Sequence, residues 1–577
     1  MKVRLAKKAG FCMGVRRAME MVLAEANKRK GPIFTFGPLI HNRQVLELLE
    51  SKDVTAVEDI KGIENSTMLI RAHGVAPQQR SLLKSSGLKI IDATCPRVAR
   101  VQAIIRYNTN KGYTPVIVGE KDHAEVVGLM GYGKGRAYVI NSPSEVSDLP
   151  ETDRLFVVAQ TTQNEESYRE ITDAIKKRCP DALVFDTICD ATRDRQDEVR
   201  AMAGQVDGIV VVGGYHSGNT RRLAQISEAT GLPTFHVETE KELDKEKLSS
   251  MEVIGVTAGA STPNWMIKNV VREIEAIRSR RETFLGRWLR QAFKFLHLSN
   301  LFVAIGAFSL SHAAAILSGR RPDLLHPLLA FFYVYAMRVL NRFLDKGASV
   351  YNDPERAAFY RRHRIILILS GIVSIIASLF IALHMSPAIF MAVAGLCILG
   401  IIYSVTIVPT SLRHLWKYSK IKDVPGSKTL FEALAWAAII TLLPLLEPDR
   451  IEWSTAIISF YTILAMTYVR SALYDILQIQ GDLIVGVESL PITLGERKTM
   501  LILKWIVISV APLLIVGTIF DLVTTFSILI LLCFFSLLLC LLAYEKRRID
   551  PGPSIEYLVE GNLFLAGLLG LIWQILS

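Results

Sequence analysis

From about residue 298 to its end, the chain is a succession of long apolar runs, and this feature limits its fold more than any other. About nine of these runs are long enough to cross a bilayer core of roughly 30 Å. They begin near NLFVAIGAF, LLHPLLAFF, IILILSGIV, SPAIFMAVA, LFEALAWAA, WSTAIISFY, LILKWIVIS, TTFSILILL and NLFLAGLLG. Because backbone polar groups in lipid must be satisfied within the spanning segment, we expect an all-α integral membrane bundle.

The loops of this half predict its orientation. Basic loops follow the second, fourth, sixth and eighth runs, as RRHR, SLRHLWKYSKIK, GERK and YEKRR, although SGRR at 318–321 is an exception. The positive-inside rule places these loops, and with them the N-terminal half, in the cytoplasm. The opening MKVRLAKKAG agrees, because it lacks the apolar segment of a secretory signal. We therefore expect a multi-pass protein of the inner or cell membrane with a cytoplasmic N-terminal half.

Residues before about 280 have a different pattern, in which short apolar runs alternate with polar helical segments. IFTFGPLI, TPVIVGE, LFVVAQTT, DGIVVVGG and MEVIGVTAGA are such runs, and each ends in small or polar residues. This alternation predicts an α/β domain with parallel sheets. In such sheets ligands bind beyond the carboxyl ends of the strands.

The polar residues that follow these strands are the first candidates for a functional site. Taken singly, each is expected to be a loop cap or a satisfied polar group. They are His41, His73, Cys95, His123, Glu125, Thr161, Thr162, Cys189, Ser217, Asn219 and Ser261.

The chain has seven cysteines, no CxxC pair and a predicted cytoplasmic N-terminal half, so a disulfide framework is not expected. Cys12, Cys95 and Cys189 lie at strand ends and are spread about evenly. Three thiolates from three βα units could hold an iron-sulfur cluster and leave one iron open to substrate. The alternative is three unrelated cysteines packed as small hydrophobes, and spacing alone does not decide between the two.

Nine ordered segments carry a specific resemblance. They are AGFCMGVRRAME, GPLIHNRQV, RAHGV, IDATCPRV, GEKDHAEVVGLMG, AQTTQ, DTICDATRDRQDEV, VVGGYHSGNTRRL and GVTAGASTP. Together they resemble the hydroxymethylbutenyl diphosphate reductase family (LytB/IspH), the last enzyme of the non-mevalonate isoprenoid pathway. The resemblance implies three pseudo-symmetric α/β modules around a four-iron four-sulfur (4Fe-4S) cluster bound by Cys12, Cys95 and Cys189.

The same resemblance implies what the other polar residues do. The family reduces 4-hydroxy-3-methylbut-2-enyl diphosphate to isopentenyl and dimethylallyl diphosphate, so the site needs a proton source and donors for a diphosphate. Glu125 is the expected proton source, and Thr161 or Thr162 orients the substrate alcohol. The expected diphosphate donors are His41, His73, His123, Ser217, Gly218, Asn219 and Ser261.

One position departs from the family. Where the family usually has Ser-Ser-Asn, this chain has Ser217-Gly218-Asn219, so one hydroxyl is missing. The backbone N–H of Gly218 still serves a phosphate oxygen, so we expect weaker or shifted diphosphate binding and retained activity.

The segment IRSRRETFLGRWLRQAFKFLHL connects the two halves. Basic residues alternate in it with Phe, Leu and Trp, as in an amphipathic helix on an anionic membrane surface. The alternative is the solvated end of the first domain. We expect a domain at 1–280, a basic amphipathic linker at 281–297 and a membrane domain at 298–577.

Polar residues at the cytoplasmic ends of the spans mark a second candidate site. Asn341 and Asp345 follow the second apolar run, and Asp475 and Asp482 follow the sixth. Carboxylates seven residues apart near a helix end share a face, and two such sets could hold Mg²⁺ against a diphosphate. These regions, KDVPGSK at 422–428 and the pattern GD...G...LP..LG resemble the UbiA-type membrane prenyltransferase family.

The departures from the UbiA pattern weaken this second expectation. The usual Asn-Asp-x-x-Asp-x-x-x-Asp reads here as Asn341, Arg342, Asp345 and Ser349, and Gln478 replaces a common acid in the second motif. Fewer carboxylates weaken divalent-metal binding, although Arg342 could pair with a phosphate. Three interpretations remain open: an altered prenyltransferase, a prenyl-lipid-binding anchor without catalysis, and a structural bundle whose acids cap helices.

The sequence thus predicts a five-carbon diphosphate reductase fused to a membrane unit that moves or binds a polyprenyl diphosphate. The expected partners are a small diphosphate substrate, a ferredoxin or flavodoxin type electron donor and membrane lipid, with no nucleic acid. The alternative for the N-terminal half is a redox sensor that keeps a cluster without catalysis.

Overall fold

The computed structural model describes residues 1–28, 31–152, 154–277, 284–344, 348–403, 424–447, 453–546 and 553–576. The chain divides into two compact units, Met1–Thr283 and Phe284–Ser577, hereafter the N-terminal and C-terminal units. Each unit is described by itself.

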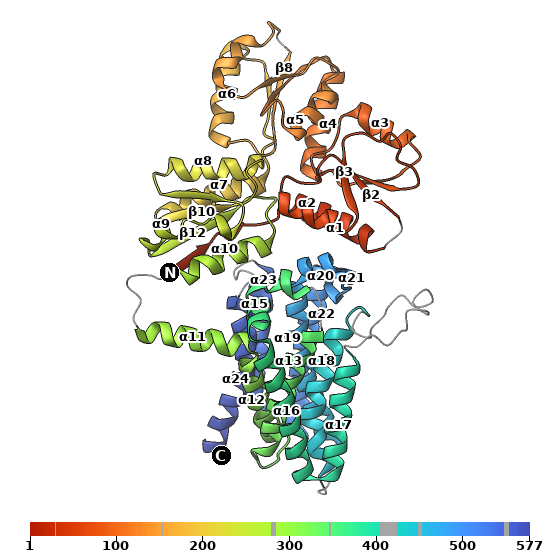
Figure 1. Cartoon of the computed structure of the whole chain (residues 1–577), viewed down its shortest axis with the longest axis vertical. Helices are drawn as coiled ribbons and strands as arrows, with labels where there is room; N and C mark the ends of the chain where they lie inside the picture. Colours follow the sequence, from red (N-terminus) through yellow and green to blue (C-terminus); the bar gives the residue numbers. More distant parts are fainter. Residues whose placement is uncertain are drawn as a thin grey trace. The chain divides into compact units, whose positions relative to one another are not determined.

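Three four-stranded sheets make up the N-terminal unit, and every strand pair in them is parallel (Figure 1). The central strands are rich in branched apolar residues and fully buried, as in GIVVV at 208–212 and LFVVA at 155–159. In spatial order the sheets are β1 (Lys2–Leu5), β12 (Val253–Ala258), β10 (Gly208–Val212), β11 (Thr234–Val237); β5 (Lys89–Asp92), β4 (Thr67–Ile70), β2 (Ile33–Phe36), β3 (Val54–Val57); and β9 (Leu183–Phe185), β8 (Leu155–Ala159), β6 (Thr114–Val118), β7 (Tyr138–Ile140).

The three sheets share one connectivity, which confirms the expected three parallel α/β modules. In each, an edge strand leads into a helix that packs on the next sheet. The helix α1 (Met13–Asn27) follows β1 and pairs Glu25 with Lys89 of β5. The helix α4 (Pro96–Asn110) follows β5 and packs on β6, and α7 (Asp190–Ala203) follows β9 and packs on β12. The ends of β1, β5 and β9 are therefore the three points where the chain passes from one module to the next.

At the carboxyl ends of the inner strands, short connections lead into further helices. The helix α2 (Arg43–Glu50) follows β2, α5 (Ala124–Met130) follows β6, and α8 (Gly218–Ala229) follows β10. Three other helices, α3 (Pro77–Ser85), α6 (Glu165–Arg178) and α10 (Asn264–Ala276), follow β4, β8 and β12. These nine helices therefore begin beyond the carboxyl ends of strands, and the short α9 (Lys245–Ser249) is the tenth described helix of the unit.

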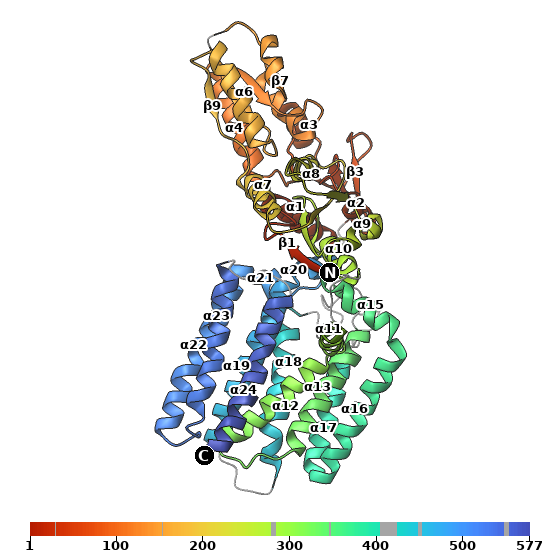
Figure 2. The same ribbon diagram turned by 90° about the vertical axis from the view of Figure 1, so that its left-hand side faces the viewer.

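The described residues of the C-terminal unit form a helical bundle (Figure 2). The helix α16 packs against α17, and α22 against α23, while α19 has the most buried apolar span. The long helices are α12 (Leu301–Leu317), α13 (Leu325–Leu344), α16 (Arg364–Met385), α17 (Pro387–Ile402), α18 (Ser427–Ala437), α19 (Trp453–Leu477), α22 (Glu496–Ile519), α23 (Ser527–Glu545) and α24 (Pro553–Leu576).

Within the described residues of this unit, six helical segments are long and apolar enough to cross a membrane, or up to seven if a bent pair counts as one span. The expected number of about nine is therefore not confirmed; α17, for example, is apolar but has 16 residues. Large apolar side chains remain exposed on the outer helices, such as Ile365 at 73% and Phe535 at 60%. An apolar surface of this extent belongs in lipid, so the C-terminal unit is embedded in a membrane.

The helix α11 (Phe284–Leu298) opens the C-terminal unit and meets α12 at a bend of 75°. It has no acidic residue, and Leu285, Trp288 and Leu289 are more than half exposed. The expected linker at 281–297 thus overlaps a helix of the C-terminal unit, and its amphipathic role at a membrane surface stays a prediction; the arginines at 278, 280 and 281 lie outside the described residues.

Candidate active site and cofactor centre

Each of the three candidate cysteines occupies the position just before a module-crossing helix. Cys12 is the N-cap of α1, Cys95 of α4 and Cys189 of α7, and all three have extended backbones. The Sγ of Cys12 accepts a hydrogen bond of 3.5 Å from the N–H of Val15. Each sulfur therefore stands at a helix N-terminus, where free backbone N–H groups and the helix dipole carry partial positive charge.

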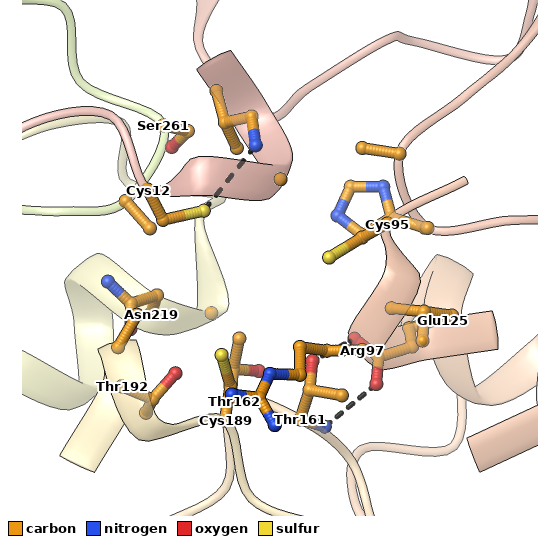
Figure 3. A pocket seen from close by; sticks show the side chains of 18 of the residues that line it. Cys12, Cys95, Arg97, Glu125, Thr161, Thr162, Cys189, Thr192, Asn219 and Ser261 are labelled. Carbon is orange, nitrogen blue, oxygen red and sulfur yellow. Dashed lines mark hydrogen bonds between the residues drawn. The ribbon is translucent and has the colours of Figure 1, made fainter. Parts of the chain in front are cut away.

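The three sulfur atoms point into one shared pocket and lie around it, apart from one another (Figure 3). The empty space of the pocket, including open solvent at its mouth, is about 740 Å³. Burial raises the pKa of the Cys95 and Cys189 thiols, and the neighbouring cysteines raise both further. Three thiolates in this arrangement therefore need a positively charged centre between them.

Two further observations test whether an iron-sulfur cluster fits here. A Cβ atom on Gly14 would lie 2.5 Å from Sγ of Cys95 and 3.9 Å from Sγ of Cys12, so only glycine leaves that wall open. Arg195 is 4% exposed and donates a hydrogen bond of 2.6 Å to the carbonyl of Gly10. It also interacts electrostatically with Cys12 and Cys189. Three thiols around an open space, with a buried cation beside them, fit an iron-sulfur cluster ligated by Cys12, Cys95 and Cys189.

A buried carboxyl group lies in the same pocket. Glu125, in the first turn of α5, is 1% exposed and accepts hydrogen bonds from the N–H of Thr161 at 2.7 Å and its hydroxyl at 2.8 Å (Figure 3). Burial raises the pKa of Glu125, and the two bonds from Thr161 only partly oppose this shift. The group therefore keeps its proton to a higher pH than an ordinary glutamate, as a proton donor requires.

His123 is held in one orientation by the start of α5. As the N-cap, its Nδ1 accepts a hydrogen bond of 3.1 Å from the N–H of Glu125. In the neutral ring the proton then lies on Nε2. That nitrogen faces Gly218, at whose position a Cβ atom would lie 3.5 Å away. His123 thus offers an N–H donor into the pocket.

Three histidine rings meet at one side of the pocket. The ring centroids of His41, His73 and His123 lie 4.7 to 5.5 Å apart. Burial lowers the pKa of His41 and of His123 to about 4, and that of His73 well below its usual value, and neighbouring cationic groups, including Arg71, add to each shift. The rings are therefore neutral at pH 7, and a negatively charged ligand would favour their protonation.

The beginning of α8 contributes hydroxyl and amide groups. Ser217 is the N-cap of α8, and its Oγ accepts a hydrogen bond of 3.3 Å from the hydroxyl of Ser261. Asn219 is 5% exposed, and its Nδ2 has no hydrogen-bond partner among the described residues. Two imidazole nitrogens, His41 Nε2 and His73 Nδ1, are likewise buried without a partner in the described chain. These polar groups surround a space suited to a phosphate.

The candidate residues of the N-terminal unit thus line a single pocket. Those that sequence reasoning singled out are Cys12, His41, His73, Cys95, His123, Glu125, Thr161, Thr162, Cys189, Ser217, Gly218, Asn219 and Ser261. Sequence reasoning missed Arg97, Thr192 and Arg195, which also line it. All three lie in the quoted cysteine segments, but nothing in their spacing separates them from solvent-facing helix residues.

The candidate residues of the C-terminal unit are arranged differently. Asp475 lies in α19, which ends at Leu477, whereas Asp482 lies in α20 (Ile479–Val485). Gln478 interrupts the helix between them, and the expectation that the two carboxylates share one helix face stays a prediction. Asn341 lies in α13, and Asp345 lies outside the described residues.

The fold and the pocket define a class: a three-module α/β protein with a three-cysteine cofactor centre, continued by a helical membrane unit. Residues 3–275 match the LytB protein family, and residues 301–566 match the UbiA prenyltransferase family. The chain belongs to the LytB (IspH) family through its N-terminal unit and carries a UbiA prenyltransferase domain in its C-terminal unit.

Relatives of the N-terminal unit are similar over nearly their whole length. The 4-hydroxy-3-methylbut-2-enyl diphosphate reductase of Opitutus terrae is 43% identical over 289 residues, which cover 48% of this chain and 100% of the relative. The enzyme of the same name from Geotalea daltonii is 44% identical over 277 residues, covering 48% and 98%.

Two solved structures are similar to one unit each. A structure of (E)-4-hydroxy-3-methyl-but-2-enyl diphosphate reductase is 38% identical, covers 48% of this chain and 100% of its own, and has a TM-score of 0.40. A UbiA homolog from Archaeoglobus fulgidus bound to GPP and Mg²⁺ is 16% identical, covers 48% and 98%, and has a TM-score of 0.35.

Proposed function

We propose that the N-terminal unit is an iron-sulfur enzyme that reduces 4-hydroxy-3-methylbut-2-enyl diphosphate to isopentenyl and dimethylallyl diphosphate. The observation that carries this proposal is the convergence of Cys12, Cys95 and Cys189 on a pocket that also contains Glu125. The relatives named above, which this chain covers almost completely, support the choice of substrate.

The overall reaction breaks the allylic C–O bond, consumes two electrons and two protons, and releases water. A 4Fe-4S cluster held by Cys12, Cys95 and Cys189 would supply these electrons, with a ferredoxin or flavodoxin type protein as the donor. The protein supplies protons and holds the substrate. Glu125 carries a proton on its buried carboxyl group. The hydroxyl of Thr161, whose oxygen lies 2.8 Å from Oε2 of Glu125, connects this carboxyl group to the substrate alcohol.

In this proposal the diphosphate is held by the three histidines and by the start of α8. His123 donates through Nε2, His41 and His73 have unpartnered ring nitrogens, and Ser217 and Asn219 lie at the start of α8. The positive end of that helix and the nearby Arg71 and Arg221 favour the negative charge of a diphosphate. Gly218 adds its backbone N–H but no hydroxyl.

For the C-terminal unit we propose binding of a polyprenyl diphosphate, with transfer of its prenyl group as the candidate reaction. The UbiA domain and the buried polar side chains at the helix ends support this proposal. An anchor that binds prenyl lipid without catalysis is the second candidate, favoured by the interrupted α19–α20 pair. The basic loops support a cytoplasmic location of the N-terminal unit.

The experiment that tests the reductase is anaerobic purification of the full chain in detergent, followed by substrate reduction with an artificial electron donor. Cys95→Ser should lose both turnover and the cluster absorbance. Cys179→Ser is the matched control, because Cys179 is a buried cysteine of the same unit outside the pocket. A wild-type chain that binds a cluster but never turns over would instead support a redox sensor.

A further inference from the structure

The helix α4 begins directly after Cys95 and contains no acidic residue. Arg100 and Arg106 are exposed on it, and neither side chain has a hydrogen-bond or ion-pair partner among the described residues. Hereafter the α4 face is the set of exposed residues Ala99, Arg100, Ala103, Arg106 and Tyr107. These positions recur every three or four residues, so they share one side of the helix. Two free guanidinium groups therefore lie on one small surface.

A small hollow borders both the α4 face and the cofactor pocket. Its empty space, including open solvent, is about 350 Å³. It is lined by Ile188 and Asp190, the chain neighbours of Cys189, and by Arg97, which also lines the cofactor pocket (Figure 3). Arg97 itself follows Cys95 by two residues. A group that enters the hollow therefore comes close to two of the three cysteines.

The acids of the hollow are already paired. Asp190 forms a short ion pair with Arg97, and Asp186 pairs with Arg193 at 2.9 Å. Arg100 also lines the hollow. Of the charged residues that line it, Arg100 alone has no partner of opposite charge within the described chain. The unpaired charge at the hollow is therefore positive, and it suits a carboxylate from another molecule.

The outer part of the α4 face adds an aromatic side chain. Tyr107 is 59% exposed, and Nζ of Lys111 lies 4.3 Å from the centre of its ring. Tyrosine is enriched in protein interfaces and among their energetically important residues. The 15 residues of α4 span roughly 22 Å. A surface of this length suits a small interface, of the kind below about 1,200 Å² that transient electron-transfer partners form.

We propose that the α4 face and the hollow beside it are the docking surface for an acidic electron-carrier protein, whose carboxylates pair with Arg100 and Arg106. The proposal rests on the reductase function proposed above. The position of the hollow beside two of the cysteines favours an electron carrier over an anionic lipid surface.

The electron count explains why such a surface is charged and small. Each substrate molecule consumes two electrons, so a one-electron carrier docks twice in each turnover. Each time, the reduced carrier loses one electron to the cysteine-ligated centre, is thereby oxidised, and leaves. Exposed charges suit these repeated contacts, because they speed association without a large buried interface.

The test uses the full chain, purified anaerobically in detergent with its cluster, and two electron donors. One donor is a reduced acidic ferredoxin, and the other is reduced methyl viologen, a small cation. The double variant Arg100→Glu/Arg106→Glu should raise the KM for ferredoxin about tenfold, because two attractive charges become repulsive, and leave kcat within about twofold. Turnover with methyl viologen should not fall, since a small cation gains nothing from a basic surface. Arg97 is left intact, because it lines the cofactor pocket.

Binding is also measured without turnover. Biolayer interferometry of oxidised ferredoxin on the immobilised chain gives a Kd, which should rise in the double variant as the KM does. In the wild type this Kd should increase with salt concentration, and in the double variant it should not, because salt screens the attraction between exposed charges.

The control makes the same change of charge elsewhere on the same module. Lys176→Glu/Lys177→Glu lies in the last turn of α6, which packs on the opposite face of the sheet from α4. Its KM and Kd for ferredoxin should stay within about twofold of the wild type. Iron content per chain and thermal unfolding verify that each variant is loaded and folded.

The outcomes separate the docking surface from the reductase. An unchanged KM and Kd in Arg100→Glu/Arg106→Glu would overturn the docking surface, and turnover with methyl viologen would still support the reductase. Equal losses in the α4 and α6 variants would also overturn it, since net charge alone would then govern binding. Ferredoxin binding that depends on Arg100 and Arg106, in a wild-type chain that turns over with neither donor, would support the docking surface and refute the reductase.

Discussion

A Cβ atom built on Gly14 would lie 2.5 Å from the sulfur of Cys95, closer than these atoms can approach. Gly14 is on α1, and Cys95 is the N-cap of α4, so two modules of the N-terminal unit approach each other closely at the cofactor centre. Since the backbone of Gly14 is helical, an alanine here is compatible with the helix itself. Its effect would therefore come from the lost space beside Cys95.

The first prediction is that Gly14→Ala lowers cluster occupancy. The new methyl group displaces the Cys95 side chain, so iron content and the cluster absorbance per chain should fall severalfold, while helix content stays unchanged. Gly204→Ala is the control, because nothing lies within 4 Å of its Cβ position. Equal iron content in both variants would contradict the assignment of Cys95 as a ligand.

The second prediction concerns Glu125. Glu125→Gln can keep the bond from the N–H of Thr161 to Oε1, and its Nε2 can donate to the Thr161 hydroxyl instead of accepting from it, but the variant lacks the proton that the carboxyl can give. Turnover should fall by about 10² to 10⁴, the usual range for a general acid, with the cluster spectrum unchanged. Steady-state assays measure turnover, and spectroscopy of rapidly frozen samples measures the cluster spectrum. Full turnover in this variant would show that a group other than Glu125 donates the proton.

Part of this site could be predicted from the sequence because the βα pattern fixes where strands end. Cys12, Cys95 and Cys189 follow edge strands, and the carboxyl ends of parallel strands gather ligands. The burial of Arg195 could not be predicted, because it depends on α7 crossing from one module to another. The interruption of the helix between Asp475 and Asp482 was also missed, since a periodicity argument assumes an unbroken helix.

The third prediction is that Gly218→Ser strengthens diphosphate binding. The added Cβ would lie 3.5 Å from Nε2 of His123 and 3.8 Å from Oγ1 of Thr162, which are ordinary contact distances. The serine hydroxyl should donate to a phosphate oxygen, and such a bond to a charged group lowers the Kd for inorganic diphosphate about tenfold. Isothermal titration calorimetry measures this change. Gly204→Ser serves as the control, and weaker binding by Gly218→Ser would place the diphosphate elsewhere.

The fourth prediction concerns the dependence of diphosphate binding on pH. The pKa of His41 and of His123 is about 4 in the ligand-free pocket, against 6.5 ordinarily. From pH 6.5 down to about 4, the unfolded chain therefore binds protons that the folded unit does not, and folding stability falls as the pH drops through this window. A bound diphosphate reverses the sign, because its negative charge raises both pKa values and favours the protonated rings.

Diphosphate binding at pH 6 should accordingly take up protons from the buffer. Titrations in two buffers of different ionisation enthalpy measure the number taken up, and His41→Asn should reduce it while the ionisation of the ligand itself stays the same. The uptake should grow as the pH falls from 7.5 to 6, since protonation of a ring is less costly at lower pH. Proton uptake that is the same in wild type and His41→Asn would mean that the diphosphate does not approach the His41 ring, and the anion would then have to be held by His73, His123 and the start of α8.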